Sequence, residues 1–246
     1  MGKTFSILLF NVIMLNAFSQ PQLPIGQWRN HLPMRQVVDI EQEGDEMVVA
    51  TQFGLFRYAP ASKEFRVFTS SQGLSDVRVN MLVQKPAANK YLLAYQNGNI
   101  DLIEKESIYN VPDILRSSQQ GNKTIHHGLW QNDDVWLSTG LGIIVVNTIK
   151  KEIRETIRIS DNSRDGEVYL LAILGGQIFA ATGGGLKKAS FPNASLANPL
   201  QWSDEIIPMT SGVIQKVLAW NDKLLAQKND SIFFLLTNPV GNPNRC

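Results

Sequence analysis

Asp161, Ser163 and Asp165 are spaced like the first ligands of a calcium-binding loop. They belong to the segment DNSRDGE at 161–167, in which oxygen-bearing side chains alternate before a glycine. Oxygens at alternate positions can converge on a hard cation such as Ca²⁺. The twelfth position of such a loop normally carries an acidic residue, but here it is Ala172. We therefore expect an Asx-rich turn between two repeats, with a calcium site as the alternative.

The three histidines do not suit a metal centre. His126 and His127 are adjacent, so in a strand their side chains point to opposite faces and cannot ligate one ion together. Only His31 remains as a third nitrogen ligand. We expect one of the adjacent pair to be packed and the other to lie at a strand edge, and we predict neither a metal nor a cofactor.

Trp130 and Trp220 lie beside the similar turn sequences QNDD and WNDK. Matching positions in a repeat indicate matching packing. Flat apolar rings can also stack on sugar rings, so an aromatic platform for a glycan is the alternative.

The sequence contains no recognisable catalytic motif. It has no G-x-S-x-G elbow, and no nucleophile lies in an identifiable arrangement. The glycines at 183–185 follow an expected strand, but no helix opens after them, so they do not form a phosphate cradle. We predict that the chain is not an enzyme.

A short motif recurs along the chain at a nearly constant interval. The copies are ATQFG at 50–54, AYQNG at 94–98, STGLG at 138–142, ATGGG at 181–185 and AQKND at 226–230. Their last residues are Gly54, Gly98, Gly142, Gly185 and, in the degenerate fifth copy, Asp230. The intervals of 44, 44, 43 and 45 residues indicate a structural repeat. We expect the four glycines to allow tight connections or close backbone approaches.

Each copy has similar surroundings. Two short apolar segments precede the motif, separated by a turn rich in Gly, Asn and Asp, and one or two more follow it. Four short strands in about 44 residues are typical of a propeller blade. We therefore predict an all-β propeller over 20–246, with blades at about 36–76, 77–120, 121–165, 166–210 and 211–240.

The N-terminal segment 1–19 predicts export. One basic residue, Lys3, precedes an apolar stretch that ends in small residues, as in a cleaved signal peptide. The remaining chain carries 22 basic and 22 acidic residues, which disfavours nucleic acid as a partner. The only cysteine, Cys246, has no partner within the chain. We expect a periplasmic or outer-surface protein of a Gram-negative bacterium, without a membrane span.

Several strings resemble the N-terminal propeller of the PorZ family of the type IX secretion system. They are IGQWRNHLPMRQVVDI at 25–40, AYQNGNIDLI at 94–103 and KTIHHGLW at 123–130, within a resemblance that covers about 25–236. More broadly, the repeats resemble those of two-component-regulator propellers. The resemblance implies a surface protein that binds anionic lipopolysaccharide and presents it to a PorU-like sortase. Members of the family carry two propellers and a sorting domain, so we expect a partial, truncated seven-bladed propeller here.

The sequence therefore favours a non-enzymatic module for binding and scaffolding in the attachment complex. One alternative is a periplasmic glycan-sensing propeller of a hybrid two-component regulator. A second is a lyase or hydrolase built on a propeller, which would require ionisable residues clustered on one face.

Overall fold

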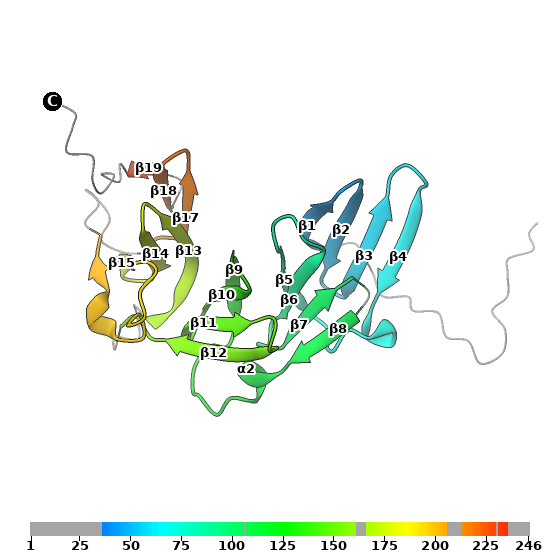
Figure 1. Cartoon of the computed structure of the whole chain (residues 1–246), viewed down its shortest axis with the longest axis horizontal. Helices are drawn as coiled ribbons and strands as arrows, with labels where there is room; N and C mark the ends of the chain where they lie inside the picture. The colour runs from blue at the N-terminus through cyan, green and yellow to red at the C-terminus, as the bar shows by residue number, and fades with distance from the viewer. Residues whose placement is uncertain (1–35, 106, 161–165, 206–212, 230, 236–246) are drawn as a thin grey trace, which may run out of the picture. The chain divides into compact units, whose positions relative to one another are not determined.

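The structure is a computed structural model that describes residues 36–105, 107–160, 166–205, 213–229 and 231–235 (Figure 1). The chain divides into two compact units, Met1–Leu32 and Pro33–Cys246, and every described residue belongs to the second. The expected signal peptide and the segment with Trp28 and His31 therefore lie outside the described residues.

The described residues form five antiparallel sheets, in each of which the strands follow one another in chain order. The first contains β1 (Val37–Glu43), β2 (Glu46–Thr51), β3 (Gly54–Ala59) and β4 (Glu64–Phe68). The second contains β5 (Val79–Gln84), β6 (Lys90–Tyr95), β7 (Ile100–Glu104) and β8 (Ser107–Val111). The third contains β9 (Ile125–Gln131), β10 (Asp134–Thr139), β11 (Gly142–Asn147) and β12 (Glu152–Ile157). The fourth contains β13 (Val168–Leu174), β14 (Gln177–Thr182), β15 (Gly185–Ser190) and β16 (Ser203–Asp204). The fifth contains β17 (Lys216–Trp220), β18 (Lys223–Lys228) and β19 (Ser231–Leu235).

Helical structure in the described residues is limited to single turns. These are η1 (Ser70–Gln72), α2 (Asp113–Arg116) and η2 (Pro199–Gln201). The all-β fold of short sheet repeats that the sequence predicts is thereby confirmed.

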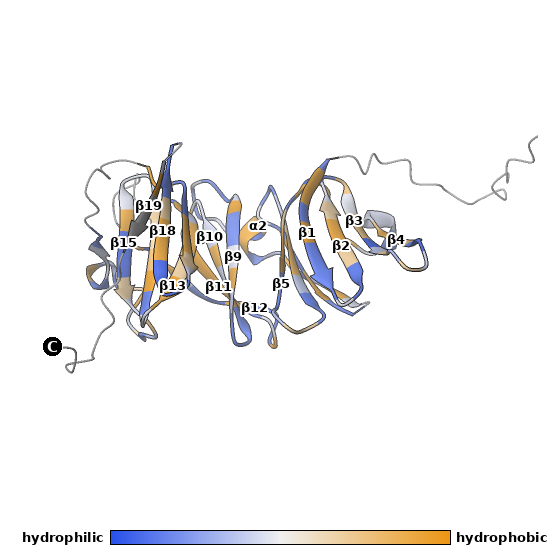
Figure 2. Ribbon diagram, turned by 90° about the horizontal axis from the view of Figure 1, so that it is seen from above, coloured by the Kyte–Doolittle hydropathy of each residue, from blue (hydrophilic) through white to orange (hydrophobic). Residues whose placement is uncertain are grey.

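The core lies between successive sheets. Four clusters of buried apolar side chains join the first sheet to the second, the second to the third, the third to the fourth and the fourth to the fifth. Both faces of an interior sheet are covered, so its central strands are buried along almost their whole length, as in β6, β10 and β14. Figure 2 shows the result, with apolar strands separated by polar turns.

A threonine and a glycine close the same turn in three of the sheets. The hydroxyl of Thr139 donates to the carbonyl oxygen of Gly142 at 2.8 Å. The pairs Thr51–Gly54 and Thr182–Gly185 repeat this bond at 3.0 and 2.9 Å. All three threonines are fully buried, so the bond satisfies a hydroxyl and a carbonyl that water cannot reach.

Gly98 has a different place from the other repeat glycines. In the second sheet Tyr95 takes the position of the threonine, and its backbone N–H donates to the carbonyl of Asn99. The loop is therefore one residue longer, and Gly98 lies inside it with a φ of +85°. A Cβ there would lie 3.0 Å from the carbonyl oxygen of Lys123, so the glycine allows a close approach of backbone.

The fifth copy of the motif is one residue out of the predicted register. The hairpin between β17 and β18 closes at Trp220 and Lys223, as the hairpin between β9 and β10 closes at Gln131 and Asp134. Lys223 therefore corresponds to Asp134. The pair Lys228–Ser231 follows Lys223 at the same distance along the chain as the pair Thr139–Gly142 follows Asp134, so it takes the places of the repeat threonine and glycine. The predicted place of Asp230 was therefore wrong by one residue.

The same closures correct the predicted match between Trp130 and Trp220. Trp220 matches Gln131, whereas Trp130 matches Ala219. A shift of one residue along a strand turns the side chain to the opposite face. Accordingly Trp130 is buried with 8% of its surface exposed, and Trp220 is 56% exposed.

Candidate functional site

The first strand of four sheets contains a β-bulge at the same place. Where each of β1, β5, β9 and β13 pairs with the second strand of its sheet, one residue near its start has no partner in the pairing. The skipped residues are Val38, Asn80, His126 and Tyr169. A bulge re-aims the extra side chain and is common beside binding sites. We call these four residues the bulge row.

Side chains of the bulge row contact the neighbouring sheet. The amide of Asn80 donates to the backbone carbonyl of Ile125, which precedes the next bulge residue. The ring of His126 lies edge-on to that of Tyr169, with the ring centroids 5.5 Å apart. These contacts agree with the first strands lying side by side, β5 against β9 and β9 against β13.

Glu167 holds the third and fourth sheets together at this place. Its carboxylate Oε1 lies 2.8 Å from His126 Nε2 and accepts from Asn122 Nδ2 at 3.0 Å. The phenol of Tyr169 lies 3.5 Å from the other carboxylate oxygen. Burial raises the pKa of the Tyr169 phenol, and the negative charge of Glu167 adds to the effect. The phenol therefore stays protonated at neutral pH and donates to this carboxylate oxygen.

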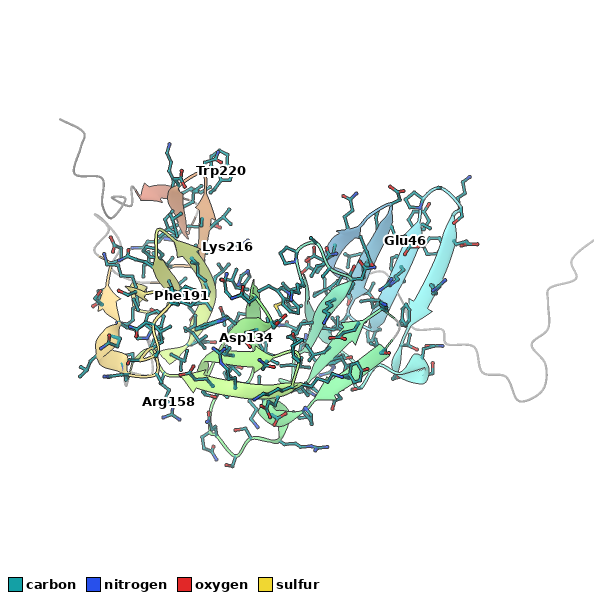
Figure 3. The ribbon with its side chains drawn as sticks, viewed as in Figure 1. Glu46, Asp134, Arg158, Phe191, Lys216 and Trp220 are labelled. Carbon is teal, nitrogen blue, oxygen red and sulfur yellow. The ribbon has the colours of Figure 1, made fainter. Side chains whose placement is uncertain are left out.

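A cavity of about 310 Å³ opens beside the bulge row. Its lining residues are His126, Tyr169, Leu170, Val213, Gln215 and Lys216. Lys216 begins β17 and forms no ion pair within the described chain (Figure 3). The cavity thus combines a free ammonium group, an imidazole and an amide with an apolar wall, which suits the binding of a ligand with anionic or hydrogen-bonding groups.

The two adjacent histidines have the different environments that the sequence indicates. His127 is packed, and burial lowers the pKa of its imidazole. Its Nδ1 has no hydrogen-bond partner among the described residues. His126 reaches the cavity instead, with its side chain 23% exposed.

The calcium candidates Asp161, Ser163 and Asp165 lie outside the described residues, so the choice between a turn and a metal loop stays a prediction. Glu167, the last residue of the segment DNSRDGE, is hydrogen-bonded through its carboxylate to His126 and Asn122. Within the described ranges no three His, Cys, Asp or Glu side chains gather as metal ligands would.

Sequence reasoning missed the bulge row. Asn80, Tyr169 and Lys216 belong to no motif, and Glu167 was noted only as the last residue of DNSRDGE. One signal could have identified part of the set. His126 and Tyr169 each precede a repeat threonine by 13 residues, as Val38 does. A polar or aromatic residue at this offset in successive repeats indicates a shared position.

The family of this chain follows from its sequence over the first four sheets. Residues 47–203 match the model of the N-terminal β-propeller domain of PorZ from the type IX secretion system. The match covers more than half of the chain. The chain belongs to the PorZ N-terminal propeller family. Its sheets are accordingly propeller blades, which we number one to five in chain order.

Solved structures share the fold of this PorZ-family chain. PorZ of Porphyromonas gingivalis, a surface component of the type IX secretion system, matches with a TM-score of 0.74 and 17% identity over 83% of this chain and 27% of that protein. The extracellular domain of a one-component system from B. thetaiotaomicron matches with a TM-score of 0.63 and 16% identity, over 87% of this chain and 28% of that protein. The extracellular domain of a hybrid two-component system from that species matches with a TM-score of 0.58 and 12% identity, over 80% of this chain and 26% of that protein.

The chain spans between a quarter and a third of the length of these three proteins. No curated protein matches it. Among the described residues, no helix has both the length and the apolar character that crossing a bilayer requires.

Proposed function

We propose that this chain is a non-catalytic module for binding and scaffolding at the bacterial surface. The observation that carries the proposal is the family match over residues 47–203. PorZ of Porphyromonas gingivalis is a surface component of the type IX secretion system, which supports an exported chain with the same setting. Its partners would be anionic lipopolysaccharide and a PorU-like sortase.

The bulge row and the cavity beside it are the proposed site for anionic groups of the lipopolysaccharide. Lys216 supplies a positive charge without an ion-pair partner in the described chain. The side-chain amide of Gln215 adds a hydrogen-bond donor, whereas the hydroxyl of Tyr169 donates to Glu167. The carboxylate of Glu167 is held by His126 and Asn122, which reduces its repulsion of an anion at the cavity.

The groups at this site favour binding over catalysis. Covalent catalysis at a histidine needs a nucleophilic hydroxyl or thiol within hydrogen-bond reach of that base. Within the described chain, His126 contacts the carboxylate of Glu167 and the ring of Tyr169, and the Tyr169 hydroxyl donates to Glu167. We expect no turnover of glycans, peptides or esters by the purified chain.

Binding of the chain to supported membranes tests the proposal. One membrane contains purified lipopolysaccharide with its anionic polysaccharide, and the other contains lipopolysaccharide without it. We expect saturable binding to the first membrane alone. Lys216→Glu should weaken that binding about tenfold, because it replaces an attraction with a repulsion.

Lys223→Glu is the matched control, since it makes the same charge change in an exposed residue at the start of β18. Its affinity should equal that of the unaltered chain. Equal binding to the two membranes, or an equal loss in the two variants, would contradict the proposed site. A capture experiment with the purified sortase then tests the protein partner separately.

A further inference from the structure

A larger groove of about 640 Å³ lies between the third and fourth blades, at the opposite end of β9 from His126. Its walls come from the end of β9, from β10 and β12, and from the segment that follows β15. Asp134 and Phe191, which are labelled in Figure 3, both line it. The residues that carry the argument are Gln131, Asp134, Trp136, Arg154, Glu155 and Phe191.

The indole N–H of Trp136 lacks an acceptor. Trp136 is only 5% exposed, yet its N–H donates to no group in the described part of the chain. Two other tryptophans are buried among the described residues, and these, Trp130 and Trp202, donate to the carbonyls of Val83 and Leu196 at 3.4 and 2.9 Å. The N–H of Trp136 is not among the buried polar atoms without a partner in the described chain, so it reaches solvent although most of the residue is covered. Trp136 is therefore a donor left over for a group that enters the groove.

Other polar groups in the groove are also uncommitted. Arg154 donates through Nη1 to Asp134, and its guanidinium carbon lies 6.0 Å from the centroid of the Trp136 ring. The remaining N–H groups of that guanidinium have no acceptor within the described chain. The side chains of Gln131 and Glu155 likewise form no hydrogen bond within the described chain. The groove thus offers hydrogen-bond donors from Trp136 and Arg154 and an acceptor from Glu155. The amide of Gln131 can both donate and accept.

The charges in the groove disfavour an anion. Asp134 and Glu155 are acidic, and Arg154 is the only cation among the described lining residues. Because Arg154 is already paired with Asp134, a second carboxylate or a phosphate would face uncompensated repulsion from Glu155.

A sugar fits this combination of groups. A hydroxyl both donates and accepts, so neighbouring hydroxyls can satisfy Trp136 and Glu155 together. Phe191 meets Trp136 edge to face, with centroids 5.3 Å apart, and adds apolar surface for the C–H face of a sugar ring. We propose that this groove binds an uncharged oligosaccharide, with Trp136 and Arg154 donating to its hydroxyls and Glu155 accepting from them.

Titration calorimetry with free hexasaccharides tests this site without the lipopolysaccharide. The uncharged probes are maltohexaose, cellohexaose, isomaltohexaose and mannohexaose. Hexagalacturonate is the anionic comparison, and the glucosamine hexamer is the cationic one. We expect at least one uncharged hexamer to bind more tightly than either charged one. The double variant Gln131→Ala/Glu155→Ala should weaken this binding about tenfold, because two hydrogen-bonding groups are lost.

Two further variants separate the groups. Trp136→Phe keeps an aromatic ring but removes the N–H, so it should weaken binding even at temperatures well below its melting transition. Glu155→Lys should shift the preference toward hexagalacturonate. Glu152→Ala, at an exposed residue of the same strand outside the groove, should leave the affinity unchanged.

The proposal is overturned if no uncharged hexamer binds, if a charged hexamer binds most tightly, or if the double variant retains the full affinity. These outcomes are independent of whether anionic lipopolysaccharide binds at the bulge row, because the two sites share no lining residue.

Discussion

At the scale of single residues, one buried carboxylate organises the second blade. Asp101 is fully buried, and its oxygens accept from the Tyr95 hydroxyl at 2.6 Å, the Ser75 backbone N–H at 2.8 Å and the Asn110 amide at 3.1 Å. Burial raises the pKa of the Tyr95 phenol, and the charge of Asp101 raises it further. The carboxylate thus links β6, β7 and β8 to the segment before β5.

Asp101→Ala should lower the free energy of unfolding by about 3 kcal/mol, because the buried Tyr95 hydroxyl loses its acceptor and the partly buried bonds from Ser75 and Asn110 are lost as well. Asp204→Ala is the comparison, since Asp204 forms an exposed ion pair with Lys187 and should cost less than about 1 kcal/mol. Urea unfolding measures both values. Equal costs in the two variants would show that the Asp101 contacts add little.

His127 should make stability depend on pH on the acid side. Burial lowers the pKa of its imidazole below the ordinary value of 6.5, so the folded state binds a proton less readily than the unfolded state. Its contribution is present above pH 6.5 and is lost as the pH falls through the folded-state pKa. His127→Phe should therefore lose less stability than the unaltered chain between about pH 7 and pH 5. Parallel urea titrations check this, and identical losses would contradict it.

At the scale of elements, tight connections place glycine where a side chain does not fit. Gly142 has a φ of +110°, and a Cβ there would lie 2.5 Å from the backbone oxygen of Ile157. Gly44 also has a positive φ, of +60°, but a Cβ there meets nothing within 4 Å. The two glycines separate the cost of backbone conformation from the cost of a steric clash.

Gly142→Ala should destabilise the chain by about 3 kcal/mol, because it adds a clash to backbone strain. Gly44→Ala should cost only about 1 kcal/mol, since only the conformational penalty applies. Thermal or urea unfolding of the two variants gives the difference. A cost at Gly44 as large as that at Gly142 would mean that the clash is relieved by a small shift of β12.

Sequence reasoning identified the strands because each repeat joins apolar segments through turns of Gly, Asn and Asp. Both residues of the turns 175–176 and 221–222 have the positive φ that such residues tolerate. The fifth copy was misplaced because AQKND lacks both the threonine and the glycine, so nothing in the string fixed its register. The glycine spacing could not show that Gly98 lies inside its loop, because the extra residue of that loop leaves the spacing unchanged.

The candidate sites were harder to predict, because they depend on contacts between blades. His126 and Glu167 lie 41 residues apart in the sequence. Trp136 and Phe191 come from different blades, and neither stood out from the other aromatic residues before the groove was seen. A β-bulge also removes the alternation that would otherwise tell which side chains share a face.

At the scale of the whole molecule, one face of the fifth blade exposes three large apolar side chains beside Lys216 and Lys223. Leu218 and Trp220 lie two residues apart on β17, so their side chains share a face. Ile232 on β19 lies on the same face, because it pairs with Gln227 of β18, which in turn pairs with Lys216. Their exposed fractions are 59%, 56% and 63%. The opposite face, with Val217 and its neighbours, is buried against the fourth blade. Exposed apolar surface of this kind favours association.

We predict that the chain self-associates at micromolar concentration and that Leu218→Lys/Ile232→Lys makes it monomeric, since two charges would have to be buried in the contact. Ile149→Lys is the control, because Ile149 is similarly exposed, at 58%, but lies in the turn after β11. Sedimentation velocity distinguishes the species. A monomeric unaltered chain at the same concentration would contradict the prediction.

Amide hydrogen exchange with and without anionic lipopolysaccharide tests the central claim, that this propeller module binds through its bulge row. The account predicts slower exchange at the starts of β9, β13 and β17, where His126, Tyr169 and Lys216 line one cavity, and little change in β3 and β4. Unchanged exchange throughout the chain, or protection confined to the first blade, would contradict it.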